Sequence, residues 1–367
     1  MNPEITKTKI EDFGYDAFFE SNQKKLGLGE FSVARVTVEH RGAYEVINEN
    51  GEFLAKITGK QMFNASSRED YPAVGDWVLI TELNAGQAVI QAMLSRKTII
   101  KRKFGNKNKT GEKTETQIIA ANINVAFVVE SVGRDYNLNR FERYFALAAE
   151  GGVRPAIILN KVDLISKEEL KLKLLEIKKR FPEIDVIPTS TVSGEGLDEL
   201  RAYIVKGKTY CFLGSSGVGK SSLVNKLLGE SVIRTEDISS YSGRGKHITT
   251  NREMYFLPNG GIVIDNPGMR EVGMIDVGSG IDELFDEITV LSKGCKYKDC
   301  THVQESGCQV LESLKSGKLD EAKYSNYIRL KKEAEFYEMS DLEKRQKDRS
   351  FGQFVKKAKK ELKGYKF

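Results

Sequence analysis

The sequence has no long apolar stretch. No window of its 367 residues approaches the roughly 20 uninterrupted apolar residues of a membrane-spanning helix. The opening residues 1–7 also lack the apolar core of a secretory signal peptide. We therefore expect a cytoplasmic protein that does not use a membrane.

Cysteine is scarce, and three of the four cysteines lie together. Cys295, Cys300 and Cys308 share a fourteen-residue segment with His302. Disulfides are not expected in a cytoplasmic protein, whereas three thiolates and an imidazole suit one tetrahedral Zn²⁺ ion. The set leaves no open ligand position, so we expect a structural zinc; reduced cysteines beside an incidental histidine are the alternative. Cys211 stands alone in an apolar run and is predicted to be a small buried residue.

The net charge of +5 is small, but the basic residues are unevenly distributed. Residues 344–367 carry ten Lys or Arg against two acids, and residues 96–113 carry eight against one. Two basic segments separated by a balanced middle are typical of a protein that binds a polyanion. Solvated helix faces and an unstructured tail are the alternative explanation.

The length predicts two or three domains. The first, over residues 1–112, reads as short strands broken by turn glycines. Five strands within about 75 residues predict a small closed β-barrel, and the OB type is the commonest nucleic-acid binder of that size; a barrel without an RNA role is the alternative. The only tryptophan, Trp77, is expected in the core. The expected strands span residues 31–39, 44–47, 53–57, 77–80 and 88–93.

A second domain is predicted over residues 113–284, beginning near Thr114 after a polar, basic connector at 104–111. Apolar runs here alternate with helical patterns, which predicts a parallel sheet covered by helices on both faces. The expected strands are 123–129, 155–159, 186–188, 210–213 and 261–264, and the expected helices 139–150, 167–181, 197–204 and 221–228. A third domain, residues 285–367, holds the cysteine cluster and a basic helical tail.

A glycine-rich segment follows the apolar run at 210–213. It matches the phosphate-loop pattern G-x-x-x-x-G-K-[ST], in which backbone N–H groups and a helix N-terminus bind a phosphate chain. Lys220 is expected to contact the β- and γ-phosphates, and Ser221 a magnesium ion. The predicted phosphate-binding residues are Gly214, Ser215, Ser216, Gly217, Val218, Gly219, Lys220, Ser221 and Ser222.

The strand at 155–159 ends in an N-K-x-D element made of Asn160, Lys161, Val162 and Asp163. The Asp163 carboxylate can accept from guanine N1–H and from its exocyclic amine, while Asn160 faces O6 and N7 and Lys161 covers the ring. Adenine would leave this carboxylate unpaired, at a cost of about 1.5–3 kcal/mol per lost bond. The element therefore predicts guanine selectivity.

Three further segments fit a GTP site. Thr189, Ser190 and Thr191 form a turn where a backbone N–H and a small side chain could close over the guanine oxygen, although such a turn is also an ordinary helix cap. The long polar segment 235–250 is interpreted as a switch, in which Thr250 or, as the less favoured choice, Thr249 caps magnesium and the γ-phosphate. The last segment follows the strand at 261–264: Asp265 is expected to hold magnesium through water, and Gly268 N–H to meet the γ-phosphate.

No glutamine stands where one usually orients the attacking water, because Met269 follows the Asp265 motif. A slow intrinsic rate is therefore expected. We hypothesise that His247, or a backbone group near it, positions that water once a partner orders the switch. The alternative is that His247 is a solvent-exposed residue of the switch.

The order of the motifs is unusual, because the guanine element precedes the phosphate loop. The same sheet can form only if the domain is circularly permuted. This order, with a barrel before it and a Cys₃His cluster after it, resembles the ribosome small subunit-dependent GTPase A family, the RsgA/YjeQ type. Two positions depart from the family pattern: Asn266 replaces a usual threonine, and Ile248 interrupts a usual run of threonines.

The resemblance implies a GTPase that binds GTP and GDP with Mg²⁺, contacts the small ribosomal subunit and its 16S-type rRNA through barrel, zinc region and tail, is stimulated by that subunit, and assists its late assembly. Nothing in the sequence demands a dimer, so a monomer is expected.

A phosphate-loop kinase is disfavoured because the N-K-x-D element would then have no function. A GTP-regulated factor for another RNA or for the large subunit is the remaining alternative.

Overall fold

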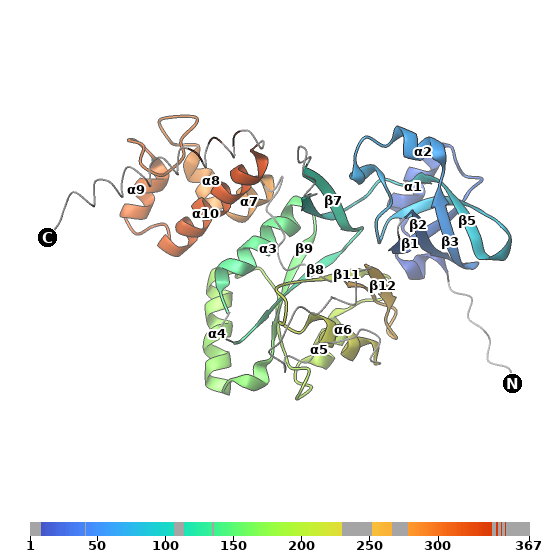
Figure 1. Cartoon of the computed structure of the whole chain (residues 1–367). Coiled ribbons are helices and arrows are strands. Elements are labelled where there is room, and N and C mark those ends of the chain that lie inside the picture. Colours follow the sequence, from blue (N-terminus) through green and yellow to red (C-terminus); the bar gives the residue numbers. More distant parts are fainter. Residues whose placement is uncertain are drawn as a thin grey trace. The chain divides into compact units, whose positions relative to one another are not determined.

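The computed structural model describes residues 9–40, 42–105, 114–133, 136–229, 252–265 and 278–339, with 343, 346 and 349 (Figure 1). It divides into two compact units. The first comprises Met1–Arg102 with Thr116–Val272, and the second Lys103–Glu115 with Gly273–Phe367. Among the helices of these described ranges, none combines the length and the apolar character needed to cross a bilayer.

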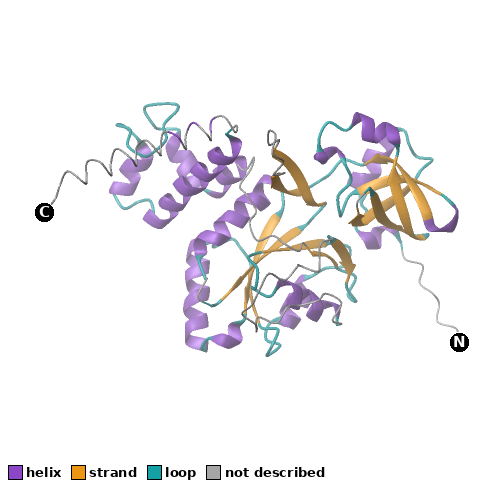
Figure 2. Cartoon of the chain, viewed as in Figure 1, coloured by secondary structure: helices purple, strands orange, loops and turns teal. Residues whose placement is uncertain are grey.

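Five strands near the N-terminus form a closed barrel, as predicted. They are β1 (Ser32–His40), β2 (Ala43–Asn48), β3 (Gly51–Ile57), β4 (Trp77–Glu82) and β5 (Gln87–Met93). The strand order is β1-β2-β3-β5-β4, and β1 closes the barrel by pairing with β4. Alternate residues face inward, so that Val36, Val46 and Ile90 are fully buried in its interior. Figure 2 shows these strands together with their short flanking helices.

An N-terminal helical segment covers one outer face of the barrel. Its helix α1 (Ala17–Leu26) begins where Asp16 accepts a hydrogen bond from Phe18 N, and it ends at Gly27 with φ of 66°. Trp77 is fully buried under this segment, beside Phe19, which confirms its predicted place in a core. The short helices around the barrel are η1 (Ile10–Phe13), α2 (Gly59–Asn64), η2 (Arg68–Asp70) and η3 (Asn84–Gly86).

The second fold of this unit is a parallel sheet with one antiparallel edge strand. Its strands are β8 (Val125–Ser131), β9 (Arg154–Asn160), β10 (Val186–Thr189), β11 (Thr209–Leu213), β12 (Glu253–Phe256) and β13 (Ile262–Asp265), in the order β10-β9-β8-β11-β13-β12. The antiparallel strand, β12, was not predicted. It also pairs with barrel strand β1, so barrel and sheet are continuous.

Helices cover both faces of this sheet, as predicted. They are α3 (Leu138–Glu150), α4 (Lys167–Arg180), α5 (Leu197–Tyr203) and α6 (Lys220–Leu228), with the short η4 (Val162–Leu164). Figure 1 shows α3 and α4 on one side of the strands and α5 and α6 on the other. Fully buried Phe127 and Phe212 lie at the centre of the core beneath α5 and α6. Cys211 is also fully buried, in agreement with its predicted role, and burial raises the pKa of its thiol to about 12.

The remaining elements lie wholly or partly in the second unit. A two-stranded ribbon consists of β6 (Ile99–Gly105) and β7 (Thr114–Ala121), so the predicted connector is flanked by paired strands. Among the described residues up to 339, the helices of this unit are α7 (Gly278–Leu284), α8 (Asp286–Ser292), α9 (Gln309–Lys315) and α10 (Glu321–Glu338). Phe285, Val310 and Leu330 form their fully buried core.

Candidate nucleotide site and metal centre

The predicted nucleotide residues come from the carboxyl ends of parallel strands of one sheet. The phosphate loop follows β11, the guanine element follows β9, and Ser190 follows β10. These strands belong to one sheet, and Asn160 pairs directly with Thr189. The carboxyl edge of such a sheet is where open α/β folds bind ligands.

Glycines shape the phosphate loop for reasons specific to each position. Gly214 has φ of 144°, and a Cβ there would lie 2.3 Å from the Val129 carbonyl oxygen. Gly219 has φ of 99°, and a Cβ there would lie 2.3 Å from Asn160 Nδ2. Helix α6 begins at the next residue, so its first N–H groups point out of the helix at the loop. The geometry suits a phosphate chain.

Lys220 lies folded back over the same loop. Its Nζ donates to the carbonyl oxygens of Gly214 at 2.7 Å and Ser215 at 2.8 Å. A phosphate chain cradled by the loop would therefore meet a fixed positive charge. Ser221 and Ser222 follow in the first turn of α6.

The guanine element is hydrogen-bonded to the phosphate loop. Asn160 is fully buried, and its Nδ2 donates to the Val218 carbonyl oxygen at 2.8 Å. Lys161 adopts a left-handed backbone with φ of 64°, and its Nζ donates to the Gly217 carbonyl oxygen at 2.7 Å. Two segments more than fifty residues apart in the sequence thus form one site. We predicted that the Asn160 amide faces the base. One of its two hydrogens is donated to Val218, so the other can be donated to the base.

Thr189 was predicted only as part of the turn over the guanine oxygen, and its role in orienting Asn160 was not predicted. Its hydroxyl donates to Asn160 Oδ1 at 3.1 Å, which fixes the amide so that Nδ2 faces Val218. The side chain is fully buried. The signal available in the sequence was a hydroxyl residue at the end of the strand next to the guanine element.

Ser190 binds the carboxylate of the guanine element. Its hydroxyl donates to Asp163 Oδ1 at 2.5 Å and accepts from the backbone N–H groups of Val192 and Ser193 at 3.1 and 3.0 Å. Because Oγ is held by two backbone donors, its hydrogen is directed at the carboxylate. Thr191 lies half-buried in the same turn, and Val162 is buried in η4.

Asp265 is the last residue of β13 and is 4% exposed. Its strand runs parallel to β11, which leads into the phosphate loop, so both end at the same edge. The other predicted switch and γ-phosphate residues lie outside the described residues: His247, Ile248, Thr249, Thr250, Asn266, Gly268 and Met269.

A buried acid at this edge was also missed. Glu130, the last residue but one of β8, is fully buried, and its Oε2 lies 3.9 Å from Arg140 Nη1. Our predicted strand stopped one residue short of it. An acid that directly continues an apolar run was the signal.

The first basic segment is partly used by the fold itself. Arg96 pairs with buried Asp76 at 2.7 Å, Lys97 forms an ion pair with Asp16, and Lys101 lies 3.5 Å from Glu69. These three basic side chains therefore stabilise the barrel and the helical segment on it. The basic tail lies almost wholly outside the described residues.

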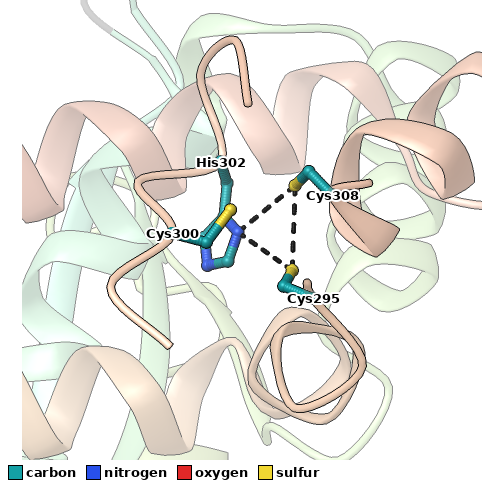
Figure 3. Close-up of side chains that lie close together, drawn as sticks. All are labelled: Cys295, Cys300, His302 and Cys308. Carbon is teal, nitrogen blue, oxygen red and sulfur yellow. Dashed lines mark hydrogen bonds between the residues drawn. The ribbon is translucent and has the colours of Figure 1, made fainter. Parts of the chain in front are cut away.

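The four predicted zinc ligands lie together in the second unit (Figure 3). Their ligand atoms are all within 4.8 Å of one another. Cys308 Sγ lies 3.4 Å and Cys295 Sγ 3.6 Å from His302 Nδ1, and the two sulfurs are 3.8 Å apart. A tetrahedral zinc with S and N ligands needs ligand separations of about 3.5–3.8 Å, so these three separations fit the ion, and Cys300 Sγ lies within 4.8 Å of the other ligand atoms.

Helix ends and an α10 tyrosine hold the ligands in place. Cys295 follows α8, and Cys308 is the N-cap residue of α9. His302 has φ of 60°, and its carbonyl oxygen accepts from the Tyr324 hydroxyl at 2.8 Å. Glu305, which we did not predict, accepts from Thr301 N at 2.8 Å and from Val303 N at 3.0 Å, so it organises the loop between the ligands.

The protonation behaviour of the ligands favours a cation. Burial opposes ionisation of Cys295, but backbone N–H groups at the start of α9 donate to its sulfur, and the pKa of this thiol is lowered. Burial and the neighbouring thiols raise the pKa of Cys300 to about 12, since a further negative charge there is repelled. Burial lowers the pKa of His302, which keeps the imidazole neutral and able to bind metal. A Zn²⁺ ion would remove the repulsion among the thiolates.

Comparison with known proteins agrees with this geometry. Residues 93–275 match a family model described as RsgA GTPase. The small ribosomal subunit biogenesis GTPase RsgA 1 of Bacteroides thetaiotaomicron is 38% identical over 333 residues, which cover 90% of this chain and 91% of the relative. The small ribosomal subunit biogenesis GTPase RsgA of Methanosarcina acetivorans is 38% identical over 310 residues, 84% and 81% of the two chains.

Two solved structures share the fold. YjeQ from Thermotoga maritima has a TM-score of 0.58 and 26% identity, covering 81% of this chain and 96% of its own. YloQ, described as a circularly permuted GTPase, has a TM-score of 0.56 and 20% identity, covering 82% and 93%. The predicted fold class is confirmed: an N-terminal barrel, a circularly permuted phosphate-loop domain, and a C-terminal helical region with a cluster suited to zinc.

Proposed function

The chain belongs to the RsgA GTPase family, and from this premise we propose that it hydrolyses GTP while acting in maturation of the small ribosomal subunit. One observation carries the proposal: Asn160 and Lys161 both donate hydrogen bonds to the phosphate loop. A segment suited to guanine and a segment suited to phosphates are therefore joined directly. A phosphate-loop kinase would need only the phosphate-binding segment.

The base is recognised by Asp163 in this proposal. Its carboxylate accepts from guanine N1–H and from the exocyclic amine, and Ser190 supports it by fixing Oδ1. The remaining hydrogen of the Asn160 amide is donated to the O6/N7 edge of guanine, and the aliphatic part of the Lys161 side chain packs over the ring. The turn at Ser190 and Thr191 closes over the guanine oxygen.

The phosphates are held by N–H groups of residues 214–222 and by Lys220. Ser221 and Asp265 would hold Mg²⁺, which offsets the negative charge that develops on the phosphate oxygens during transfer. The buried position of Asp265 beside the strand of the phosphate loop supports this role. The N–H of Gly268 is assigned to the γ-phosphate.

The switch threonine is assigned to Thr250, with Thr249 as the alternative. Thr250 precedes Glu253 by three residues in the sequence. Glu253 is the cross-strand neighbour of Asp265, which supports a role for Thr250 at the same ion. We assign His247 to positioning the attacking water. Full subunit-stimulated turnover by a His247→Ala protein would contradict that assignment.

One zinc ion is assigned to Cys295, Cys300, His302 and Cys308 as a structural ion. Its support is the spacing of the ligand atoms and the neutral state of the imidazole. With four protein ligands, the ion would have no open position and would supply folding energy rather than chemistry.

The proposed partner is the small ribosomal subunit, with its 16S-type rRNA. The support is that relatives matched over about nine tenths of the chain are named for small-subunit biogenesis. We assign rRNA contact to the barrel domain (1–112), the zinc domain (285–367) and its tail, and hydrolysis to the domain between them (113–284). The protein is proposed to act as a cytoplasmic monomer.

Co-sedimentation with purified ribosomal subunits tests the proposal. Small or large subunits are mixed with the protein in GDP or a non-hydrolysable GTP analogue, and phosphate release from GTP is measured in parallel. We expect binding to the small subunit and faster hydrolysis in its presence. Lys220→Ala is the matched control, because it removes a phosphate contact without altering the barrel or the zinc region. Equal binding to the large subunit, or no uptake of GTP, would overturn the proposal.

A further inference from the structure

Strand β12 lies between the barrel and the strand that carries Asp265. Glu253 of β12 pairs on one side with Asp265 of β13 and on the other with Val38 of barrel strand β1. These three residues form one row across three adjacent strands. With about 4.8 Å between neighbouring strands, the backbone of the barrel lies only about 10 Å from that of Asp265.

Barrel strand β1 is built to make this second contact. Its first half, from Ser32 to Arg35, pairs with β4 and closes the barrel, whereas Val38 pairs with β12. The ladder between β1 and β2 shifts register between Val36 and Val38, so Thr37 is an extra residue there. Such a bulge bends a strand, which allows β1 to leave β4 and reach β12.

An ion pair stands at the start of β12. Arg252 Nη1 donates to Glu39 Oε2 of β1 at 3.1 Å and to the Ile118 carbonyl oxygen at 3.3 Å. The Arg252 side chain is 11% exposed and that of Glu39 is 33% exposed. The pair therefore ties the chain just before Glu253 to the barrel, at the end of β12 that faces Asp265.

The end of β12 at Glu253 needs a stabilising contact. Glu253 and Asp265 are directly opposed in an antiparallel pair, so their side chains share one face, and like charges placed in this way are destabilising. The Tyr255 hydroxyl donates to Glu253 Oε2 at 2.7 Å and fixes that carboxylate. The pKa of Tyr255 is raised by burial and by both acids, in agreement with a shared face.

We infer that Arg252 and Glu39 are positioning residues for the magnesium site. By holding β12 against the barrel, the ion pair sets the place of Asp265 and couples the barrel to magnesium-dependent GTP hydrolysis. A ligand that shifts β1 would then alter the affinity of the nucleotide site for Mg²⁺. The inference rests on the proposed function, because it assigns a magnesium ion to Asp265.

The test is a magnesium titration of GTP hydrolysis by Arg252→Gln and Glu39→Gln proteins. We expect the Mg²⁺ concentration for half-maximal rate to rise about three- to tenfold, the range of a partly buried ion pair. The rate at saturating Mg²⁺ should stay close to that of the unchanged protein. Binding of fluorescent GDP in EDTA should not change, and the double variant Glu39→Arg with Arg252→Glu should recover part of the loss.

A second ion pair of the same unit provides the matched control. Lys206 Nζ lies 2.7 Å from Asp12 Oδ1 and joins the segment covering the barrel to the residues just before β11, at the opposite end of the strands. Asp12→Asn and Lys206→Gln should leave the magnesium titration unchanged.

Unaltered magnesium dependence in both the Arg252 and the Glu39 variants would overturn the inference, as would an equal shift in the controls. Glu39 is partly exposed, so its variant tests the inference even where the Arg252 variant folds poorly. If the unchanged protein neither binds nor hydrolyses GTP, the proposed function fails instead, which is a different result.

Discussion

The proposed nucleotide pocket and the proposed zinc cluster are built in opposite ways. The residues proposed for the pocket come from segments near residues 160, 190, 214–222 and 265, which follow different strands of one sheet. The zinc cluster takes all four ligands from a single segment of fourteen residues, braced by the helices around it. The first site depends on a preformed core, whereas a zinc ion bound at the second would take the place of part of a core. The two sites should therefore fail differently.

Loss of zinc should have the largest effect. A Cys308→Ser protein, or chelation of the unchanged protein, removes an ion that is worth about 10 kcal/mol or more to small zinc domains. We expect helices α7 to α10 to lose protection from amide hydrogen exchange, while affinity for GDP stays the same. Cys211→Ser, at a buried cysteine outside the cluster, is the control and should keep its zinc. A parallel loss of GDP binding in Cys308→Ser would show that the two sites are not independent.

The second largest effect is expected from Asp163→Asn. An amide cannot accept from both donors of guanine, and two charge-assisted bonds at about 1.5–3 kcal/mol each predict a loss of GTP affinity of about 100-fold or more. Xanthine carries an oxygen in place of the exocyclic amine, so affinity for its triphosphate should rise. Calorimetry with both nucleotides measures the change.

Asp185→Asn is the matched control for this change, because Asp185 pairs with Arg154 at 2.6 Å on the same sheet but before β10 rather than after it. It should bind GTP normally. Equal weakening of both nucleotides by Asp163→Asn would contradict guanine recognition by this carboxylate.

Gly219→Ala should weaken nucleotide binding by a smaller amount, about tenfold. The new Cβ would lie 2.3 Å from Asn160 Nδ2, so the hydrogen bond that joins the two elements must break or the loop must move. Gly217→Ala is a matched comparison: its φ of 81° is also left-handed, but a Cβ there meets nothing within 4 Å. Comparison of the GDP affinities of the Gly219→Ala and Gly217→Ala proteins separates the effect of the Cβ clash from the effect of backbone strain. A similar loss in both would show that strain alone decides.

The smallest effect is expected from Glu305→Gln. Hydrogen bonds, first from the Thr301 hydroxyl and then from its N–H, lower the pKa of Glu305 to about 2. A lowered folded-state pKa means that the stabilisation is present above the ordinary carboxyl pKa and is lost only as the pH falls toward 2. We therefore expect a faster release of zinc to a chelator, by a few-fold, with the same ratio at pH 6, 7 and 8.

Glu321→Gln, at an exposed acid in the first turn of α10, is the control for this last change and should release zinc at the original rate. A ratio between the Glu305→Gln and unchanged proteins that varies across pH 6 to 8 would mean that another group controls the loop.

Prediction from the sequence succeeded where a pattern is local. Spacing predicted that Cys295, Cys300, His302 and Cys308 lie together, and alternation with turn glycines predicted the barrel strands. The phosphate loop and the N-K-x-D element were also identified from local patterns, and their contacts with GTP stay predictions. Helix α1 was missed because its only buried residue is Phe19 and the rest of it is mostly polar. Strand β12 was missed because it is four residues long and pairs with β1 and β13, which are distant in the sequence.

The sequence by itself determined which chemistry the protein carries, since ligand identity and short spacings are fixed by covalent order. Only the tertiary structure decided that Asn160 uses its amide to hold Val218, that Thr189 orients that amide, and that Val38 of the barrel stands in one row with Asp265. Such facts depend on strand register and on hydrogen bonds between distant segments. No local pattern encodes them, because the energy of each contact depends on where the rest of the sheet has placed its partner.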